Sequence, residues 1–441
     1  MDSLKHVTIV GAGLSGPVMA TYLCDLGYEV DLYESRLDMR IVSQSAGRSI
    51  NLALSARGIA ALKDIGVFEK IKSNLLAMEG RMIHDKNGNK KLQLYGQKKD
   101  EVIYSVSRSK LNMTLMDHAE NSGGINIHFN QELQDLDLDK RTLIVNKKNV
   151  SFNQLLGADG ASSIVRKTIN NKSSINFRKA FLGHGYKELT IPSSSSNEYM
   201  LEENALHIWP RGQFMLIALP NMDKSFTCTL FLPLVGESSF QSIKTKKQVL
   251  EFFEEYFPDT ITLISELGDE YKKNPVGKLA TVYCDKWHYK DVASIFGDAA
   301  HAIVPFFGQG MNASFQDCTV MHSLMKRFEN NWKKIFSEYS RFQVPNGHAI
   351  ADMALENYIE MRDSVNDPKY IERRELELDL ESKFWDRFVP RYSMVSFHQI
   401  PYSKVYDRGE IQMNLMDSFL AGEITKNQLY NKIEERLNPI R

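Results

Sequence analysis

Hydrophobic positions near the amino terminus follow the order strand, turn, helix, strand. Residues 7–10 (Val-Thr-Ile-Val) form a short apolar run, which predicts a buried strand. A glycine-rich turn comes next, and the helical pattern after it continues to Leu26, where Gly27 can cap the helix. Residues 30–33 predict a second strand that ends at Glu34. This order is typical of one β-α-β unit.

The pattern changes several times along the next part of the chain. Residues 53–72 interleave small and apolar positions and predict a helix. Two short alternating segments, 81–84 and 91–95, flank a turn at 86–89 and predict a hairpin. Residues 108–121 predict another helix.

The second half of the chain contains two regions with different hydrophobic patterns. Residues 175–280 consist mostly of short alternating segments separated by proline and glycine, which predicts an antiparallel sheet. Residues 313–441 are almost wholly helical in pattern. We find no internal repeat, so we expect a sheet layer followed by a helical region.

Composition narrows the class of protein. The chain has 441 residues, of which 43% are hydrophobic and 25% charged, typical of a globular protein. Its net charge of -1, with Lys and Arg scattered, predicts no binding to nucleic acid or to an anionic membrane. No apolar run reaches the ~18 residues that span a bilayer, and neither end has a targeting or anchor pattern, so we expect a soluble, cytoplasmic protein. The cysteines match no zinc spacing, which predicts free thiols and no metal: Cys24, Cys228, Cys284 and Cys318.

The first glycine motif predicts a nucleotide site. Gly11, Gly13 and Gly16 have the spacing in which the first glycine makes the turn, the second admits a pyrophosphate and the third lets helix pack on strand. Glu34, at the end of the second strand, can accept hydrogen bonds from ribose hydroxyls. This motif does not distinguish NAD from FAD.

Two later segments favour FAD. In 157–166, Asp159 lies in a turn that would approach the pyrophosphate, although an ordinary strand–turn–helix explains the segment equally well. In 297–312, Asp298 is placed to meet a ribityl or phosphate group, and the helix after Gly310 would point its amino end at a flat, electron-rich ring. His301 is either catalytic or structural, and we favour the structural interpretation.

We therefore predict an α/β fold with a Rossmann-like FAD-binding domain, an antiparallel-sheet substrate domain and a C-terminal helical region that closes the active site. The predicted FAD domain is discontinuous and comprises residues 1–80, 106–175 and 281–330. The predicted substrate domain comprises 81–105 and 176–280, and the helical region comprises 331–441.

The order of the three motifs resembles the single-component aromatic flavin hydroxylases of the para-hydroxybenzoate hydroxylase type, over about residues 1–330. Five further segments resemble the kynurenine 3-monooxygenase family over nearly the whole chain: 47–58, 80–84, 93–96, 357–363 and 390–397. The resemblance implies bound FAD with NADPH and O2 as co-substrates. It implies hydroxylation of L-kynurenine to 3-hydroxy-L-kynurenine through a flavin C4a-hydroperoxide. Because eukaryotic members carry a C-terminal anchor that this chain lacks, we expect a bacterial form, whose oligomeric state the sequence leaves open.

The resemblance also implies site residues. The implied substrate contacts are Arg81, Tyr95, Asn357, Glu360, Met361 and Tyr392. Arg81 is chemically suited to a bidentate pair with the kynurenine carboxylate, and Asn357 and Met361 are four apart and share a helix face. The implied or motif-based cofactor contacts are Gly11, Gly13, Leu14, Gly16, Glu34, Arg36, Ala53, Arg108, Leu133, Asp159, Asp298, Gly310, Met311 and Asn312.

No residue is assigned as a catalytic base. An aniline ring already donates electrons to its ortho carbon, so we expect the flavin to transfer oxygen inside an apolar wall. Some members of the family have histidine where this chain has Phe307, which argues against a general role for that histidine. The expected wall is Pro305, Phe306, Phe307 and Gly308.

The sequence is also compatible with alternative functions. The chain fits a flavin hydroxylase of another aromatic substrate. A flavin halogenase is disfavoured because no two of the four tryptophans lie two residues apart. A non-catalytic FAD-holding interaction protein would use a charged face such as 372–379, although a solvated helix flank explains that segment better. Substrate-stimulated oxidation of NADPH would separate an enzyme from a binding protein.

Overall fold

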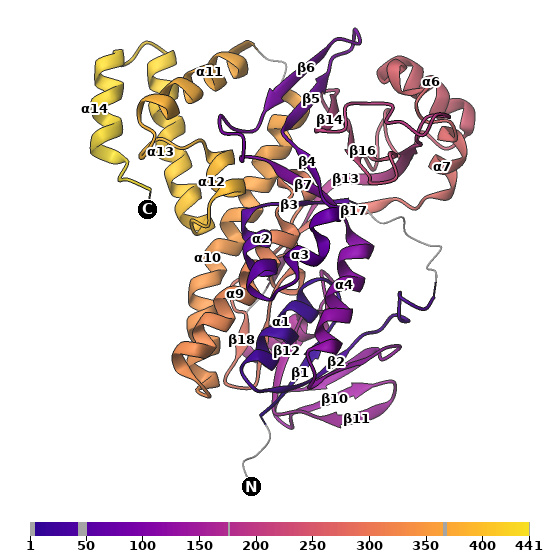
Figure 1. Ribbon diagram of the computed structural model, residues 1–441, viewed down its shortest axis with the longest axis vertical. Coiled ribbons are helices and arrows are strands. Elements are labelled where there is room, and N and C mark those ends of the chain that lie inside the picture. Colours follow the sequence, from indigo (N-terminus) through magenta and orange to yellow (C-terminus); the bar gives the residue numbers. More distant parts are fainter. Residues whose placement is uncertain (1–4, 43–50, 175–176, 365–367, 441) are drawn as a thin grey trace. The chain divides into compact units, whose positions relative to one another are not determined.

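The computed structural model describes residues 5–42, 51–174, 177–364 and 368–440, which group into two compact units (Figure 1). The first part of the family-like segment 47–58 lies outside the described residues. Unit 1 comprises Met1–Leu75, Val106–Leu182 and Leu279–Ala351, and unit 2 comprises Leu76–Ser105, Gly183–Lys278 and Asp352–Arg441. The helices after residue 352 therefore group with the second sheet, and the functional roles expected for the three predicted domains stay predictions.

Unit 1 is built on a six-stranded sheet of order β18-β19-β12-β1-β2-β8. All neighbours pair in parallel except β18 with β19. Val7, Ile9 and Leu32 are fully buried, as expected for parallel strands covered on both faces. The strands are β1 (His6–Val10), β2 (Glu29–Tyr33), β8 (Ile125–His128), β12 (Gln154–Gly157), β18 (His288–Tyr289) and β19 (Ala293–Ile295).

The first β-α-β unit is confirmed. Helix α1 (Ser15–Asp25) connects β1 to β2, and Gly27 ends it with a φ of 76°. The helix predicted over 108–121 is also confirmed as α4 (Arg108–Asn121), where the Ser107 hydroxyl accepts a hydrogen bond from the Lys110 N–H.

One helix prediction is wrong in part. Within 53–72 the chain forms β3 (Asn51–Leu54), α2 (Ala56–Asp64), α3 (Phe68–Ile71) and the 3₁₀ turn η1 (Lys72–Asn74). Gly66 has a φ of 73°, and the Val67 N–H donates to the Leu62 carbonyl, which closes a helix end. The periodicity continues across this end, but the left-handed glycine interrupts the helix.

The remaining elements of unit 1 are a small sheet and several helices and turns. Strands β9 (Leu133–Asp137), β10 (Thr142–Val145) and β11 (Lys148–Ser151) form a small antiparallel sheet. The helices and turns are α5 (Ile164–Ser173), α8 (Asp298–His301), η3 (Pro305–Phe307) and α9 (Gly310–Phe328), followed by α10 (Trp332–Ile359), which extends past the unit boundary.

Unit 2 contains most of a seven-stranded sheet of order β17-β13-β16-β15-β14-β5-β6, while the first part of β13 and most of β17 belong to unit 1. The predicted hairpin is confirmed as an antiparallel pair, in which Arg81 lies opposite Gln93. The pairing of β5 with β14 is parallel, unlike the antiparallel sheet that the sequence predicts for this region. The strands are β5 (Gly80–His84), β6 (Lys90–Leu94), β13 (Phe177–Ile191), β14 (Ala205–Pro210), β15 (Met215–Pro220), β16 (Phe226–Pro233) and β17 (Gly277–Cys284), with β4 (Leu76–Met78) paired to β7 (Ile103–Ser107) beside them.

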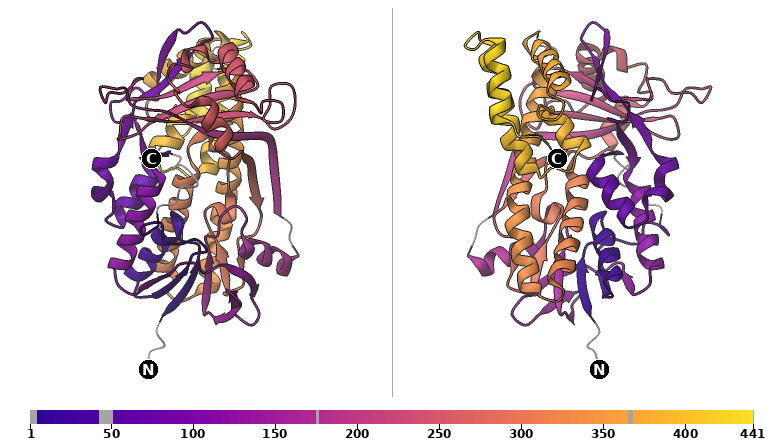
Figure 2. Two further views of the ribbon diagram at one scale, coloured as in Figure 1. Left: turned by 90° about the vertical axis from the view of Figure 1, so that its right-hand side faces the viewer. Right: turned by 60° about the vertical axis from the view of Figure 1, so that its left-hand side comes forward.

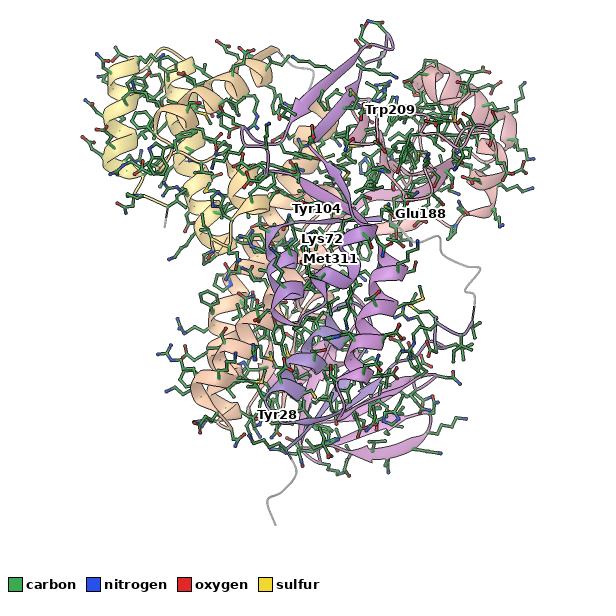
Figure 3. The ribbon with its side chains drawn as sticks, viewed as in Figure 1. Tyr28, Lys72, Tyr104, Glu188, Trp209 and Met311 are labelled. Atoms are coloured by element: carbon green, nitrogen blue, oxygen red, sulfur yellow. The ribbon has the colours of Figure 1, made fainter. Side chains whose placement is uncertain are left out.

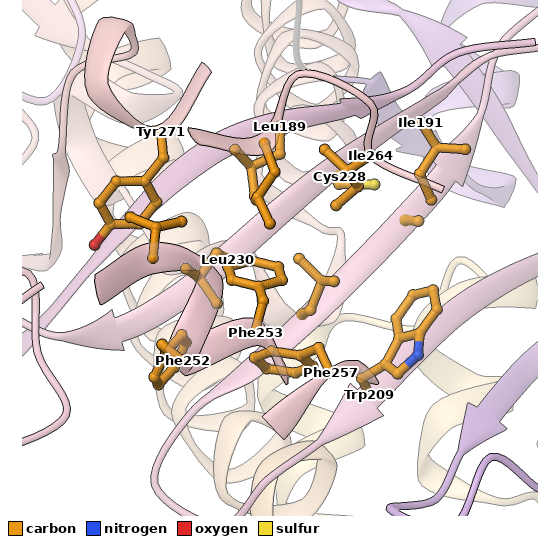
Figure 4. Close-up of a cluster of buried hydrophobic side chains, with 14 of the residues drawn as sticks. Leu189, Ile191, Trp209, Cys228, Leu230, Phe252, Phe253, Phe257, Ile264 and Tyr271 are labelled. Carbon is orange, nitrogen blue, oxygen red and sulfur yellow. The ribbon is translucent and has the colours of Figure 1, made fainter. Parts of the chain in front are cut away.

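The core of this sheet is a cluster of large apolar side chains (Figure 4). Trp209 and Leu230 on the strands pack with Phe253 and Phe257, which come from the helical side. All four are fully buried, which stabilises the sheet by about 1.5–3 kcal/mol for each side chain. The helical elements are α6 (Lys246–Tyr256), η2 (Pro258–Thr260) and α7 (Leu267–Lys273).

The last part of unit 2 is helical, as predicted. It comprises the π-helical turn η4 (Glu360–Ser364), α11 (Pro368–Lys383), α12 (Arg391–Phe397), α13 (Tyr402–Leu420) and α14 (Lys426–Arg436). Leu380, Phe388, Leu415 and Leu429 form a separate apolar cluster there. Helices α13 and α14 lie side by side as the yellow helices of Figure 2. In the described part of the chain, no helix combines the length and the apolar character that a bilayer crossing requires.

Candidate functional site

The glycine turn after β1 has two glycines that the fold needs and one that faces open space. A side chain on Gly11 would meet the Ala158 carbonyl oxygen at 2.3 Å, and one on Gly16 would meet the Gly11 carbonyl oxygen at 2.0 Å. A Cβ on Gly13 would meet nothing within 4 Å. Gly13 therefore leaves its backbone open to close approach by another group, as a pyrophosphate site requires.

The amino end of α1 supports the same chemistry. Its N-cap residue, Leu14, supplies no side-chain hydrogen bond to the first turn. A helix start of this kind presents backbone N–H groups and a positive dipole end to an anion. The open backbone at Gly13 and this helix start are suited to the diphosphate of a dinucleotide.

Glu34 lies at the end of β2, as predicted, and is nearly buried. Its Oε2 accepts a hydrogen bond from the Ala12 N–H at 2.9 Å, and its Oε1 pairs with the Arg36 Nε at 2.8 Å. Burial raises the pKa of Glu34, but the Arg36 hydrogen bond and charge outweigh it and lower the pKa. Glu34 is thus an anion fixed beside the glycine turn, and Arg36 is half exposed next to it.

The carboxylate of Asp159 forms hydrogen bonds with residues close to it in the chain. It accepts hydrogen bonds from the Ser163 hydroxyl at 2.5 Å and from the Ile164 N–H at 2.8 Å, so it caps α5. The Arg166 guanidinium donates to the carbonyls of Ala161 and Ala299, which ties the 157–166 turn to α8. A cofactor contact at Asp159 stays a prediction, while the structure shows that hydrogen bonds tie this turn to α5 and α8.

The segment 297–312 begins with a glycine whose backbone has a positive φ. Gly297 has a φ of 59°, and its N–H donates to the Asp317 Oδ2 at 2.8 Å. Asp298, the first residue of α8, is exposed while Ala299 and Ala300 behind it are fully buried. His301 is buried and bonds Asp317 through its Nε2 at 2.6 Å. These contacts leave Asp298 facing outward and give His301 a structural bond.

Asn312 has its side chain committed to the fold. Its Oδ1 accepts from the Ser55 N–H at 2.9 Å, and its Nδ2 donates to the carbonyls of Ala53 and Gly308. Any contact of Asn312 with a cofactor would therefore use the backbone, as expected at the amino end of α9. Met311, labelled in Figure 3, is the neighbouring residue of this first turn.

The predicted wall is a 3₁₀ turn, η3, that Gly308 ends with a φ of 65°. Pro305 is exposed, whereas Phe306 and Phe307 are buried. The other predicted cofactor residues belong to the same unit: Ala53 on β3, Arg108 exposed at the start of α4, Leu133 buried on β9 and Gly310 at the start of α9. Each of these roles stays a prediction.

In unit 2 the structure brings the predicted substrate residues together around Arg81. Arg81 is 6% exposed on β5, with its Nη1 at 3.3 Å from the Glu360 Oε1 and its Nη2 at 3.4 Å from the Asn357 Oδ1. Its buried Nε has no partner among the described residues. Burial opposes the charge of Arg81, but Tyr392 and Glu360 face it and raise its pKa. Arg81 is therefore a charged fork held by long, weak contacts.

Two tyrosines complete this cluster. The rings of Tyr95 and Tyr392 stack with centroids 4.9 Å apart and an interplanar angle of 9°. The Arg81 guanidinium carbon lies 4.9 Å from the centre of the Tyr392 ring. Burial raises the pKa of both hydroxyls, so both are neutral donors near neutral pH. The cluster combines one cation, flat aromatic surface and neutral hydroxyls.

The end of α10 and the π-helical turn after it supply the other predicted members of this cluster. Asn357 and Met361 contact each other, with 3.2 Å between Nδ2 and Sδ, as their spacing predicts. The backbone is π-helical from Glu360 onward, a geometry common at functional sites. Two residues that were not predicted also contact the cluster: the Tyr370 hydroxyl donates to the Glu360 Oε1 at 2.9 Å, and Arg374 donates to the Tyr95 carbonyl. In the sequence, the only indication of this pair is that Tyr370 and Arg374 are four residues apart, which places them on one face of a helix.

A second histidine–aspartate pair, with a buried histidine and a partly exposed aspartate, lies in unit 2. The His84 Nδ1 is 3.3 Å from the Asp259 Oδ2, and its Nε2 is 2.8 Å from the His207 Nδ1. The Trp209 Nε1 donates to the same Asp259 oxygen at 2.8 Å. Burial lowers the pKa of His84 and lowers that of His207 to about 4. This network joins β5, which carries Arg81, to β14 and η2.

Comparison with known proteins decides the family. The FAD binding domain family matches residues 5–340. A kynurenine 3-monooxygenase of Flavobacterium johnsoniae is 41% identical over 99% of this chain and 100% of its own length. One from Stenotrophomonas maltophilia is 42% identical over 95% of this chain and 93% of its own. The chain belongs to the kynurenine 3-monooxygenase family.

Solved structures agree with this family at the level of the fold. CtdE, solved with FAD and a substrate, aligns with a TM-score of 0.71 at 14% identity over 95% of this chain and all of its own. The tetrameric 2-methyl-3-hydroxypyridine-5-carboxylic acid oxygenase aligns with a TM-score of 0.67 at 18% identity over 84% of this chain and 96% of its own. The fold expected for a kynurenine 3-monooxygenase is thus confirmed.

Proposed function

We propose that this family member is a FAD-dependent monooxygenase that hydroxylates L-kynurenine to 3-hydroxy-L-kynurenine. NADPH and O2 are the co-substrates: NADPH supplies two electrons, one oxygen atom enters the ring, and the other leaves as water. The identity of about 40% to kynurenine 3-monooxygenases over nearly the full chain supports this activity. The observation that carries the substrate assignment is the buried Arg81 beside two stacked tyrosines.

The substrate is a zwitterionic amino acid on an aniline ring, and the cluster in unit 2 contains a partner for each part. The Arg81 fork is suited to the carboxylate, and the neutral hydroxyls of Tyr95 and Tyr392 can donate to the same oxygens. The Glu360 carboxylate, close to Arg81, is suited to the ammonium group. Asn357 and Met361 complete the lining that orients the ring.

The residues of unit 1 fit FAD. The open backbone at Gly13 and the start of α1 would hold the pyrophosphate, and Glu34 would hold the ribose. Asp298 faces outward where a ribityl chain would lie, and the first turn of α9 would present N–H groups to the ring. When bound, FAD supplies the reduction of O2 and the transfer of oxygen, and the protein supplies binding and orientation.

The chain's own residues need not remove a proton from the substrate to start the reaction, because a neutral aniline already donates electrons to the carbon ortho to its amine. This fits the nature of the proposed wall, in which Phe306 and Phe307 are apolar and buried. Their expected role is to exclude water from the reacting ring. His301 is not assigned a proton-transfer step, because its Nε2 bonds Asp317.

We also propose a cytoplasmic location. All four cysteines, which the structure describes, are free thiols, as is typical of a reducing compartment. NADPH is also available as a reductant there. Fractionation of the native host with a cytoplasmic marker enzyme tests this, and recovery with an extracytoplasmic marker would contradict it.

The direct test is product analysis. Purified protein loaded with FAD is incubated aerobically with NADPH and L-kynurenine, and the products are separated and identified by mass. We expect 3-hydroxy-L-kynurenine, with NADPH oxidation stimulated by L-kynurenine. NADPH oxidation stimulated only by another aromatic compound would contradict the substrate, and absence of any stimulation would contradict the enzyme class.

A further inference from the structure

The buried pair of His301 and Asp317 also binds the backbone, through the N–H of Gly297. His301 is on α8 and Asp317 on α9, with side chains 3% and 1% exposed and 2.6 Å between Nε2 and Oδ2. The same Asp317 oxygen accepts the Gly297 N–H at 2.8 Å, and the other accepts the Gln343 Nε2 at 2.6 Å. One carboxylate therefore holds the backbone at the Gly297 turn and binds two side chains.

The turn that Asp317 holds is conformationally demanding. Gly297 has a φ of 59°, and Asp298 follows directly as the exposed first residue of α8. A Cβ on Gly297 would lie 3.0 Å from the Ser314 hydroxyl and 3.1 Å from that of Ser15, so the turn packs tightly against α9 and α1. Asp298 thus directly follows a backbone position that is held by the Asp317 hydrogen bond and by this close packing.

A buried carboxylate needs compensation for its lost hydration. Asp317 obtains it from two neutral N–H donors and from His301, which is also stacked on Trp287 with ring centroids 5.1 Å apart. Removing one member of such a pair leaves the other charge uncompensated. The position of the Gly297 turn should therefore respond to the protonation of His301.

We propose that Asp317 and His301 are positioning residues for the FAD site, which hold the Gly297 turn so that Asp298 meets the cofactor. This inference rests on the proposed function, because it takes FAD as the occupant of unit 1. Neither residue is assigned contact with the cofactor or the substrate. Their effect is transmitted through the Gly297 backbone.

Because the charge of His301 depends on pH, the contact between His301 and Asp317 should also depend on pH. Burial lowers the pKa of His301, but the Asp317 charge and hydrogen bond outweigh it, and the net pKa is raised. The other groups that face the pair are Asp298 of α8, Cys318 of α9 and Tyr339 of α10. When the pKa is higher in the folded protein, the contribution of the histidine–aspartate pair to the free energy of unfolding is complete below the ordinary histidine pKa of about 6.5. This contribution is lost as pH rises through the raised pKa of His301.

The first test needs no substitution. Apoprotein is titrated with FAD, and the dissociation constant is measured from flavin fluorescence between about pH 6 and about pH 10. We expect constant affinity at the acidic end and about tenfold weaker binding once His301 has lost its proton. Affinity that stays constant across the whole range would overturn the proposal.

Variants separate positioning from general stability. Asp317→Asn is expected to weaken FAD binding about 10- to 100-fold at pH 7. His301→Gln keeps a hydrogen-bond donor without the charge, so its FAD affinity should fall less and lose its alkaline dependence. The matched control is Asp31→Asn, which removes a carboxylate that bonds His6 and His128 on the same sheet. It should keep both the affinity and the pH dependence of the wild type.

Two outcomes would overturn the inference in different ways. If Asp317→Asn binds FAD as tightly as the wild type, the pair is only a structural contact, and the proposed function stands. If the wild-type protein takes up no FAD at any pH, the proposed function and this inference both fail.

Discussion

Each unit buries a histidine beside an aspartate, and the two pairs behave in opposite ways. His301 and Asp317 in unit 1 are 2.6 Å apart with side chains 3% and 1% exposed. His84 and Asp259 in unit 2 are 3.3 Å apart, and the Asp259 side chain is 26% exposed. The pKa of His301 is raised, whereas that of His84 is lowered.

The difference shows that burial alone does not set the charge of a histidine. At His301 a fully buried carboxylate at short distance outweighs the loss of hydration. At His84 the carboxylate is farther away and partly hydrated, and the second ring partner, His207, adds no compensating negative charge. Unit 1 thus uses a charged pair to hold the backbone, and unit 2 uses neutral rings to join strands.

The largest expected effect separates the two units by function. Arg81→Ala should lower kcat/KM for L-kynurenine about 100- to 1000-fold, because the substrate carboxylate loses its buried charged partner. The FAD dissociation constant, measured by flavin fluorescence, should not change. Arg341→Ala, which removes an exposed arginine paired with Glu338, is the control and should match the wild type. An unchanged KM in Arg81→Ala would remove Arg81 from the site.

The next effect sharpens the contrast between the histidines. Burial lowers the pKa of His207 to about 4. A depressed folded pKa means that stability is present above about pH 6.5 and is lost as pH falls through about 4, by up to about 3 kcal/mol. The protection of β14 against hydrogen exchange, taken relative to the intrinsic exchange rate at each pH, should therefore fall on acidification, opposite in sign to the alkaline loss expected at the Gly297 turn. Equal protection of β14 at about pH 7 and about pH 5 would contradict the assignment.

An effect of intermediate size is expected from a comparison of two glycines in unit 1. Gly13→Ala should leave the melting temperature of the apoprotein unchanged, because its Cβ meets nothing within 4 Å. It should weaken FAD binding about 10- to 100-fold by blocking the approach of the pyrophosphate. Gly16→Ala should destabilise the apoprotein itself, because its Cβ would meet a backbone oxygen at 2.0 Å. Unimpaired FAD binding by Gly13→Ala would place the diphosphate elsewhere.

The smallest expected effect concerns a single hydroxyl in unit 2. Tyr95→Phe keeps the ring that stacks on Tyr392 and removes one donor, so KM for L-kynurenine should rise about 3- to 10-fold with little change in kcat. Steady-state kinetics measure both constants. Loss of kcat with an unchanged KM would show that the hydroxyl acts in the chemical step.

Local sequence signals were sufficient where local hydrogen bonds decide the structure. The glycine turn, the helix that begins at Arg108 and the hairpin that pairs Arg81 with Gln93 each depend on residues close in the chain. The helix predicted over 53–72 failed at Gly66, because periodicity does not report a left-handed residue. The parallel pairing of β5 with β14 was also missed, because strand partners are chosen by long-range packing.

The sequence by itself determined the nucleotide motif, the family and the types of residue in the site. Only the tertiary structure decided which partners those residues have. It showed that Asp159 caps a helix, that the Asn312 side chain holds β3 and that Asp317 holds the Gly297 turn. Residue type and spacing specify local geometry, whereas burial and the charge of a distant neighbour, which set a pKa, exist only once the chain has folded.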